Sequence, residues 1–226
     1  DEQRGHAGGL ERVEEVSVEA NPETASAELL DLLVSCGVNR ISIGAQSFQP
    51  QLLKTLQRWH DPARVVESVA LARTAGVRNL SLDLIFAIPQ QSFVQLKADL
   101  QAALALEPEH LSIYGLTYEP NTPLSRRLDM GQVAPVPEHR ETAMYEYLMD
   151  RLGEAGYEQY EVSNWAKWPV DCSSKISCQV TRLDPSPWRC QHNLLYWTNA
   201  NWLAIGPSGA SHVNGHRWKN ESHLGR

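Results

Sequence analysis

Residues 39–48 of the chain read NRISIGAQSF, and this stretch decides the fold. Apolar and polar or small residues alternate along it, which is the period of a β-strand with two different faces. One face carries Ile41, Ile43 and Ala45, and the other carries Ser42, Gly44 and Gln46. The same division recurs in VSVE (16–19), LSLDLIF (80–86) and LSIY (111–114). The pattern predicts four strands of one sheet.

The segments between these strands decide how the strands run. Alternation by itself is typical of an antiparallel sheet with one face in water. Each intervening segment, however, holds a helical pattern, and the order strand, helix, strand predicts a parallel sheet covered by helices. The helices then take the apolar face, so we expect an open or partial barrel with a polar lining. Its ligand should lie at the carboxyl ends of the strands, near Glu19, Gln46 and Asp83.

Capping residues and breakers predict where the helices begin and end. Thr24 or Ser26 caps a helix that runs to Cys36, and Pro50 opens a helix whose last turn carries Arg58. Further helices are predicted at 62–75, 92–104 and 137–155, and a further short strand at 157–162.

Composition excludes several classes of protein. The chain has 226 residues, of which 42% are hydrophobic and 21% are charged, with a net charge of −7. The acidic balance and the lack of a long basic run weigh against nucleic-acid binding. No apolar run approaches the length of a membrane span, and the start does not resemble a signal peptide. Four cysteines in a chain of this length do not form a disulfide framework, so a cytoplasmic protein is predicted.

The sequence also predicts an organisation into four parts. Residues 1–12 form a polar N-terminal segment, 13–167 the barrel, 168–187 an atypical loop, and 188–226 the start of a C-terminal region. Cys172, Cys178 and Cys190 fall in the stretch that lacks periodicity, and their spacing differs from that of zinc knuckles. We therefore predict no metal site in this chain.

Four polar residues form a chemically mixed set. Glu19 and Asp83 are acceptors for an ammonium or for ribose hydroxyls, Gln46 both donates and accepts, and the Arg58 guanidinium grips a carboxylate. Taken singly, the two acids are typical strand-end caps and the arginine a solvated helix terminus. Taken together on successive strands, they are the groups that a zwitterionic nucleoside requires.

These motifs resemble the radical S-adenosylmethionine (SAM) proteins related to oxygen-independent coproporphyrinogen III oxidase. The resemblance rests on SVEANP (17–22), NRISIGAQSF (39–48), SLDLI (81–85) with PQQ (89–91), HLSIY (110–114), YEVSN (160–164) and HNLLYW (192–197). It implies a six-stranded partial barrel of which four strands are present here. It also implies that Glu19, Gln46, Arg58 and Asp83 bind SAM.

The sequence departs from the family in two motifs. The C-x3-C-x2-C loop that holds a 4Fe-4S cluster and the GGGTP strand end do not occur in it. We therefore expect the cluster cysteines upstream of Asp1 and predict that the chain is incomplete at both ends.

Two branches of the family compete as the function. The HemW type binds heme and passes it to acceptor proteins, and HNLLYW matches its HNxxYW motif, which implies His192, Tyr196 and Trp197 as heme-binding residues. The HemN type is the oxidase that decarboxylates coproporphyrinogen III, and its catalytic residues are not identified here. His192 is also typical of a core histidine beside aromatic rings. A third alternative is an inactive fragment that binds only a nucleoside or a partner.

Overall fold

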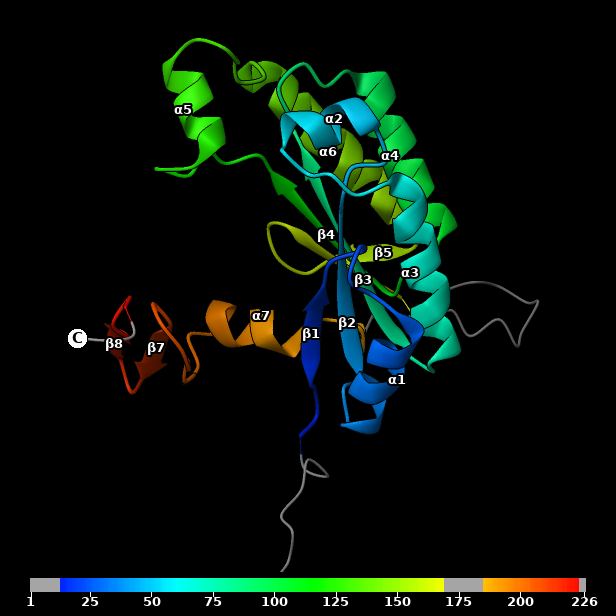
Figure 1. The fold of residues 1–226 in the computed structure, drawn as a ribbon, viewed down its shortest axis with the longest axis vertical. Coiled ribbons are helices and arrows are strands. Elements are labelled where there is room, and N and C mark those ends of the chain that lie inside the picture. The colour runs from blue at the N-terminus through cyan, green and yellow to red at the C-terminus, as the bar shows by residue number, and fades with distance from the viewer. Residues whose placement is uncertain (1–12, 169–184, 224–226) are drawn as a thin grey trace, which may run out of the picture. The chain divides into compact units, whose positions relative to one another are not determined.

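The computed structural model describes residues 13–168 and 185–223 (Figure 1). The described residues up to 188 form one compact unit, and those from 189 onward form a second. Each unit is described by itself below.

The first unit is built on a six-stranded sheet in the order β1-β2-β3-β4-β6-β5. Its four leading strands are parallel: β1 (Ser17–Ala20), β2 (Arg40–Gln46), β3 (Asn79–Phe86) and β4 (His110–Gly115). The strands β6 (Asn164–Lys167) and β5 (Tyr157–Gln159) complete it in antiparallel pairing. The four strands and their parallel order were predicted, and both predictions are confirmed.

The helices of this unit lie between the strands in sequence. They are α1 (Ala27–Ser35), α2 (Pro50–Thr55), α3 (Pro62–Thr74), α4 (Phe93–Ala105), α5 (Pro123–Asp129) and α6 (Glu138–Glu154). Figure 1 shows α1, α3 and α4 following one another along one side of the sheet. Ser26, one of the two residues predicted to cap α1, is confirmed as its cap because its side chain accepts a hydrogen bond from the first turn. The side chains of Asp61 and Ser92 cap α3 and α4 in the same way.

The two faces of the sheet divide as the alternation predicts. Ile41, Ile43 and Leu82 are at most 1% exposed and join one apolar core with residues of α1, α3, α4 and α6. On the other face the register aligns polar or small residues across neighbouring strands. One row is Glu19, Ser42, Ser81 and His110, and the next is Gly44, Asp83, Ser112 and Asn164.

Two predicted boundaries were wrong. The helix that was expected to carry Arg58 ends at Thr55, because Gln57 takes a left-handed φ of +57° and Arg58 N–H closes the turn on the Leu53 carbonyl. The strand expected at 157–162 ends at Gln159, and β6 follows it unpredicted. Trp165 and Ala166 are both buried in β6, so this strand has no wet face to produce an alternating pattern.

The second unit contains α7 (Gln191–Trp197) and a hairpin of β7 (Ala210–Val213) and β8 (His216–Lys219). An isolated bridge between Trp202 and His212 ties the loop after α7 to this hairpin. Of the predicted loop at 168–187, residues 169–184 lie outside the described residues, as does the predicted segment 1–12.

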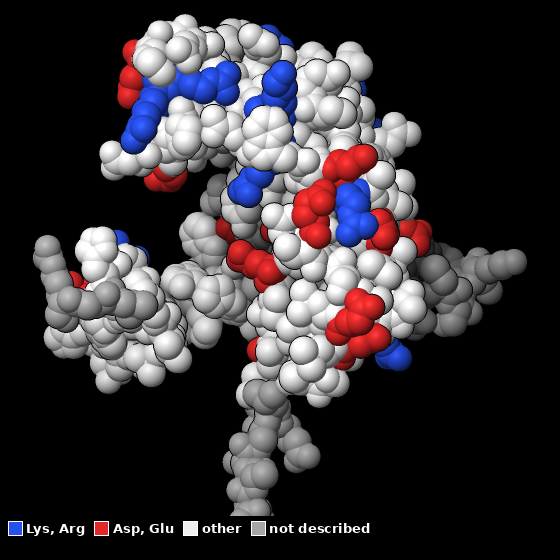
Figure 2. All heavy atoms as spheres, viewed as in Figure 1, with Lys and Arg blue, Asp and Glu red and all other residues white. Residues whose placement is uncertain are grey.

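Charges of both signs lie on the face seen in Figure 2. Acidic side chains are spread over the middle of the first unit, and basic side chains gather near α5, whose last turn carries Arg126 and Arg127. None of the described helices has the length and apolar composition needed to traverse a lipid bilayer. That nucleic acid is not a partner stays a prediction.

Candidate functional site

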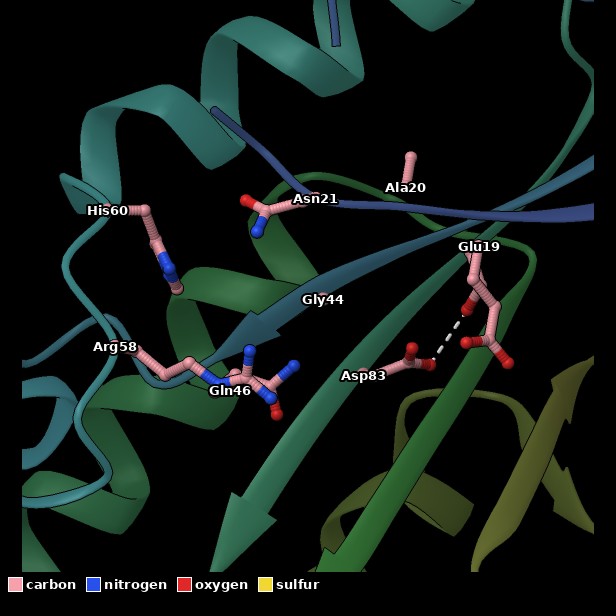
Figure 3. Close-up of a pocket in the computed structure, with 9 residues that line it drawn as sticks. Glu19, Ala20, Asn21, Gly44, Gln46, Arg58, His60 and Asp83 are labelled. Atoms are coloured by element: carbon pink, nitrogen blue, oxygen red, sulfur yellow. Dashed lines mark hydrogen bonds between the residues drawn. The ribbon is translucent and has the colours of Figure 1, made fainter. Parts of the chain in front are cut away.

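A pocket of about 260 Å³ lies at the carboxyl ends of β1, β2 and β3. All four residues of the predicted set line it, although β1, β2, β3 and the segment after α2 each supply one of them. Figure 3 shows where these four side chains lie among those that line the pocket. The lining residues are Glu19, Ala20, Asn21, Ser42, Gly44, Gln46, Arg58, His60 and Asp83. A second hollow of about 510 Å³ shares Glu19, Gln46 and Asp83 and adds Tyr114 and Ser163.

Asp83 lies in β3 at the floor of the pocket and is half-buried. Its Oδ1 accepts a hydrogen bond of 2.7 Å from the Ser42 hydroxyl, drawn as the dashed line in Figure 3. Desolvation raises the pKa of Asp83, and the Ser42 hydroxyl and the charge of Arg40 oppose that rise. A cationic group placed beside this carboxylate would offset the desolvation, so the site favours a positively charged ligand.

Gln46 reaches the pocket through an unusual backbone. Its φ is +61°, and the register with β3 shifts between Gly44 and Gln46. Gly44 leaves the room that the amide occupies, because a Cβ at residue 44 would lie 2.7 Å from Gln46 Nε2. The glycine therefore lets the glutamine side chain fold back over the end of its own strand.

Below Asp83 lies a buried polar network that the sequence reasoning missed. His110 Nδ1 lies 2.8 Å from the Ser81 hydroxyl and 3.2 Å from Arg40 Nη2, and both Arg40 and His110 are buried. A guanidinium only donates, so Nδ1 accepts and the ring proton is on Nε2, which donates to the Tyr160 hydroxyl at 2.8 Å. Burial and the Arg40 charge hold the pKa of His110 well below its ordinary value. The sequence pattern that could have revealed this network is the position of Arg40 and His110 on the polar faces of β2 and β4.

In the second unit, the predicted residues are brought together only in part. The His192 and Tyr196 rings pack edge to face with their centroids 4.9 Å apart, as expected for residues one helical turn apart. The Tyr196 ring also packs against the Trp202 ring, with a centroid distance of 4.5 Å. The Trp202 ring in turn packs against the His212 ring, with a centroid distance of 4.7 Å. Trp197 has no place in this four-ring column, and 58% of its surface is exposed.

Trp202 and His212 were missed because they come from a loop and a hairpin with no periodicity in the sequence. Both are fixed by backbone carbonyls: Trp202 Nε1 donates to Ala210 at 3.0 Å, and His212 Nδ1 donates to Ala200 at 2.9 Å. Because Nδ1 of His212 carries the proton, its Nε2 is left as an acceptor. The column is thus a run of four aromatic rings, tilted or perpendicular to one another, with an imidazole at each end.

The described cysteines do not fit an iron–sulfur cluster. Cys36 is exposed at the end of α1, and Cys190, predicted to fall in a stretch without periodicity, is buried at the start of α7. Among residues 13–168 and 185–223, no three His, Cys, Asp or Glu side chains gather in a way that would hold a metal ion. Cys172 and Cys178 lie outside the described residues.

Known proteins resemble the chain in both sequence and structure. Residues 3–103 match the radical SAM superfamily. The heme chaperone HemW of Bacillus subtilis is 35% identical over 206 residues, which are 91% of this chain and 50% of that protein. HemW of Escherichia coli is 37% identical over 194 residues, which are 85% of this chain and 45% of that protein. The chain spans about half the length of the curated relatives it matches.

Among solved structures, the coproporphyrinogen III oxidase HemN of Escherichia coli, a radical SAM enzyme, superposes with a TM-score of 0.70. The two share 17% identity, and the match covers 92% of this chain and 46% of that one, so it shows the fold alone. The predicted partial (β/α) barrel of the radical-SAM type is confirmed. Sequence match, curated relatives and fold agree in their likeness to the radical SAM superfamily, whose family model matches residues 3–103.

Proposed function

We propose that this chain belongs to a cytoplasmic HemW-like protein that binds SAM and heme and delivers heme to acceptor proteins. The observation that carries the SAM part is the convergence of Glu19, Gln46, Arg58 and Asp83 on one pocket. The heme part is supported by the HNxxYW motif at 192–197 and by relatives that are named heme chaperones.

The pocket offers a partner for each polar group of SAM. The ligand has a sulfonium, an ammonium, a carboxylate and two ribose hydroxyls. Glu19 and Asp83 provide acceptors for the ammonium and the hydroxyls, and the two acids complement the positive sulfonium. Arg58 provides a bidentate donor for the carboxylate, and the Gln46 amide both donates and accepts. A 4Fe-4S cluster supplies the electron for radical chemistry in this superfamily, but the described residues of this chain do not hold one.

The first prediction tests the nucleoside pocket. In the full-length protein, Asp83→Ala and Gln46→Ala should each weaken SAM binding by about 1–3 kcal/mol, because each leaves a polar group of the ligand unpaired. Isothermal titration calorimetry measures the change. Asp31→Ala, on the exposed face of α1, serves as the control and should bind as the wild type does. Unchanged affinity in both pocket variants would contradict the assignment.

The second prediction tests the heme site. His192→Ala should lose or shift the Soret band of the heme-loaded full-length protein, because an imidazole at the end of an aromatic column offers an axial ligand beside flat apolar contacts. His216→Ala, at an exposed position of β8, is the matched control. An unaltered spectrum and heme affinity would make His192 a packing residue and remove the best support for a chaperone.

The HemN-type oxidase is the alternative within the family. Its support here is the shared fold, which both branches have in common. A protein that takes up SAM but neither heme nor coproporphyrinogen would instead favour the third alternative, a fragment that binds only a nucleoside.

A further inference from the structure

The turn at the end of β2 holds the pocket residue Gln46 in an unfavourable conformation. A left-handed φ is uncommon for a residue with a Cβ, and it persists only where the surroundings enforce it. The φ of Gln46 is +61°, and Gln46 is the central residue of a three-residue turn that the Ser47 N–H closes by donating to the Ala45 carbonyl at 2.7 Å. The side chain's aim into the pocket therefore depends on whatever holds residues 45–49.

Two buried titratable side chains hold this turn from opposite ends. Before Gln46, His60 Nε2 lies 3.0 Å from the Ala45 carbonyl oxygen, to which it donates. After Gln46, the carboxylate of Asp99 in α4 accepts hydrogen bonds from each of the next three residues. It accepts from the Ser47 hydroxyl at 2.7 Å, from Phe48 N–H at 2.8 Å and from the Gln49 side-chain amide at 3.3 Å.

Asp99 is only 3% exposed, and it lies on α4, away from the residues that line the pocket. Burial of a carboxylate is costly unless donors surround it. The Ser47 hydroxyl also accepts from Gln49 N–H at 3.0 Å, so the donors are themselves linked. None of the ligand contacts proposed above involves Asp99. Its hydrogen bonds go instead to the residues that follow Gln46.

We propose that Asp99 is a positioning residue for SAM, whose ionised carboxylate clamps the turn at 47–49 and so aims Gln46 into the pocket. The proposal rests on the proposed function of that pocket. A protonated Asp99 loses acceptor capacity toward three donors, so the turn loosens and the ligand is bound less tightly.

The charge environment of Asp99 gives the direction of the pH dependence. Desolvation raises the pKa of Asp99, and the hydrogen bonds from Ser47, Phe48 and Gln49 oppose the rise. No charged side chain in the described part of the chain contributes to the shift, whether from α2, α4 or β2. Acidification therefore protonates Asp99 at a higher pH than an ordinary aspartate, and SAM affinity should fall through that range.

The first experiment measures the turn without any ligand. Asp99→Asn keeps the shape of the side chain but directs an amide donor at groups that donate. Hydrogen exchange of the peptide covering 45–49 should accelerate by about tenfold, the scale of one lost charge-assisted hydrogen bond. Asp150→Asn, exposed on α6, is the matched control and should leave the exchange unchanged. Exchange in Asp99→Asn equal to that of the wild type would overturn the proposal.

The second experiment separates positioning from a general structural role by the pH profile of SAM affinity in the full-length protein. Ser47→Ala removes a donor that lowers the pKa of Asp99, so the fall in SAM affinity on acidification, the acid limb of the profile, should begin at a higher pH. Protonation of Asp83 contributes to the profile as well. Its contribution is identified by Ser42→Ala, because Ser42 donates to Asp83 and the substitution moves only the part of the profile that is due to Asp83. A Ser47→Ala protein with lowered thermal stability and an unmoved acid limb would show that Asp99 is merely structural.

These outcomes also distinguish the inference from the proposed function. A wild-type protein that binds no SAM would remove the proposed function, while the exchange measurement would still decide whether Asp99 holds the turn. A wild-type protein that binds SAM with the same affinity and pH profile as Asp99→Asn would remove only the positioning role. If Asp99→Asn does not fold, Ser47→Ala supplies both measurements.

Discussion

Replacing Trp165 by alanine is expected to lower the free energy of unfolding of the first unit by about 3–5 kcal/mol, the range for removing a large buried aromatic side chain. Trp165 is 1% exposed in β6 and belongs to the apolar core. Its ring packs edge-on against Tyr145 at 6.3 Å, and Tyr145 stacks on Phe86 at 6.0 Å. The substitution leaves a cavity beside the Tyr145 ring, which loses its edge-on partner.

The indole N–H of Trp165 places the expected value toward the lower end of that range. It is buried and has no hydrogen-bond partner within the described part of the chain, so its removal relieves a desolvation cost. Urea unfolding followed by near-ultraviolet circular dichroism measures the change. Trp59→Ala removes an equal side chain that is 81% exposed, and we expect this control to stay within about 0.5 kcal/mol of the wild type. Equal effects of the two substitutions would contradict the packing described for β6.

The 226-residue chain, produced alone and reconstituted anaerobically with iron and sulfide, is expected to form no 5′-deoxyadenosine from SAM. Reductive cleavage needs an electron from a cluster held by cysteine thiolates that lie close together. The chain has four cysteines, and of the two that the structure describes, Cys36 follows α1 and Cys190 precedes α7 in the other unit. Product analysis by chromatography and the cluster absorbance give the measurement.

A protein that carries a C-x3-C-x2-C loop, treated in parallel, shows that the reconstitution itself works. A stoichiometric 4Fe-4S spectrum from the 226-residue chain would overturn the expectation if it were lost when Cys172, Cys178 and Cys190 are replaced. SAM binding without cleavage is the result that agrees with the pocket and with the cysteine positions together.

The parts of the fold that were predicted correctly have one cause in common. In β2 and β3 each residue faces either the helices or the polar interior. Apolar and polar residues therefore alternate in the sequence with the two-residue period of a strand. The same period put Gln46 and Asp83 on one face, and the parallel direction put them at one end. Their meeting in one pocket follows from those two facts.

The parts that were missed depend on contacts between distant segments. Asp99 appears in the sequence as an ordinary polar residue of a helix, and only the packing of α4 against the turn after β2 reveals its three donors. Trp202 and His212 meet through a bridge between a loop and a hairpin. Trp165 is flanked by buried residues on a strand of four, too short to show any period.

The order of the strands has a consequence for how the protein is made. Each of β2, β3 and β4 pairs with the strand that precedes it in the chain, so every step of the parallel sheet adds one strand–helix unit to an edge already formed. Domains also begin to fold from the N-terminal side during synthesis. All residues lining the Asp83 pocket lie between 19 and 83. The pocket can thus take shape on the ribosome-bound chain while the HNxxYW segment is still untranslated.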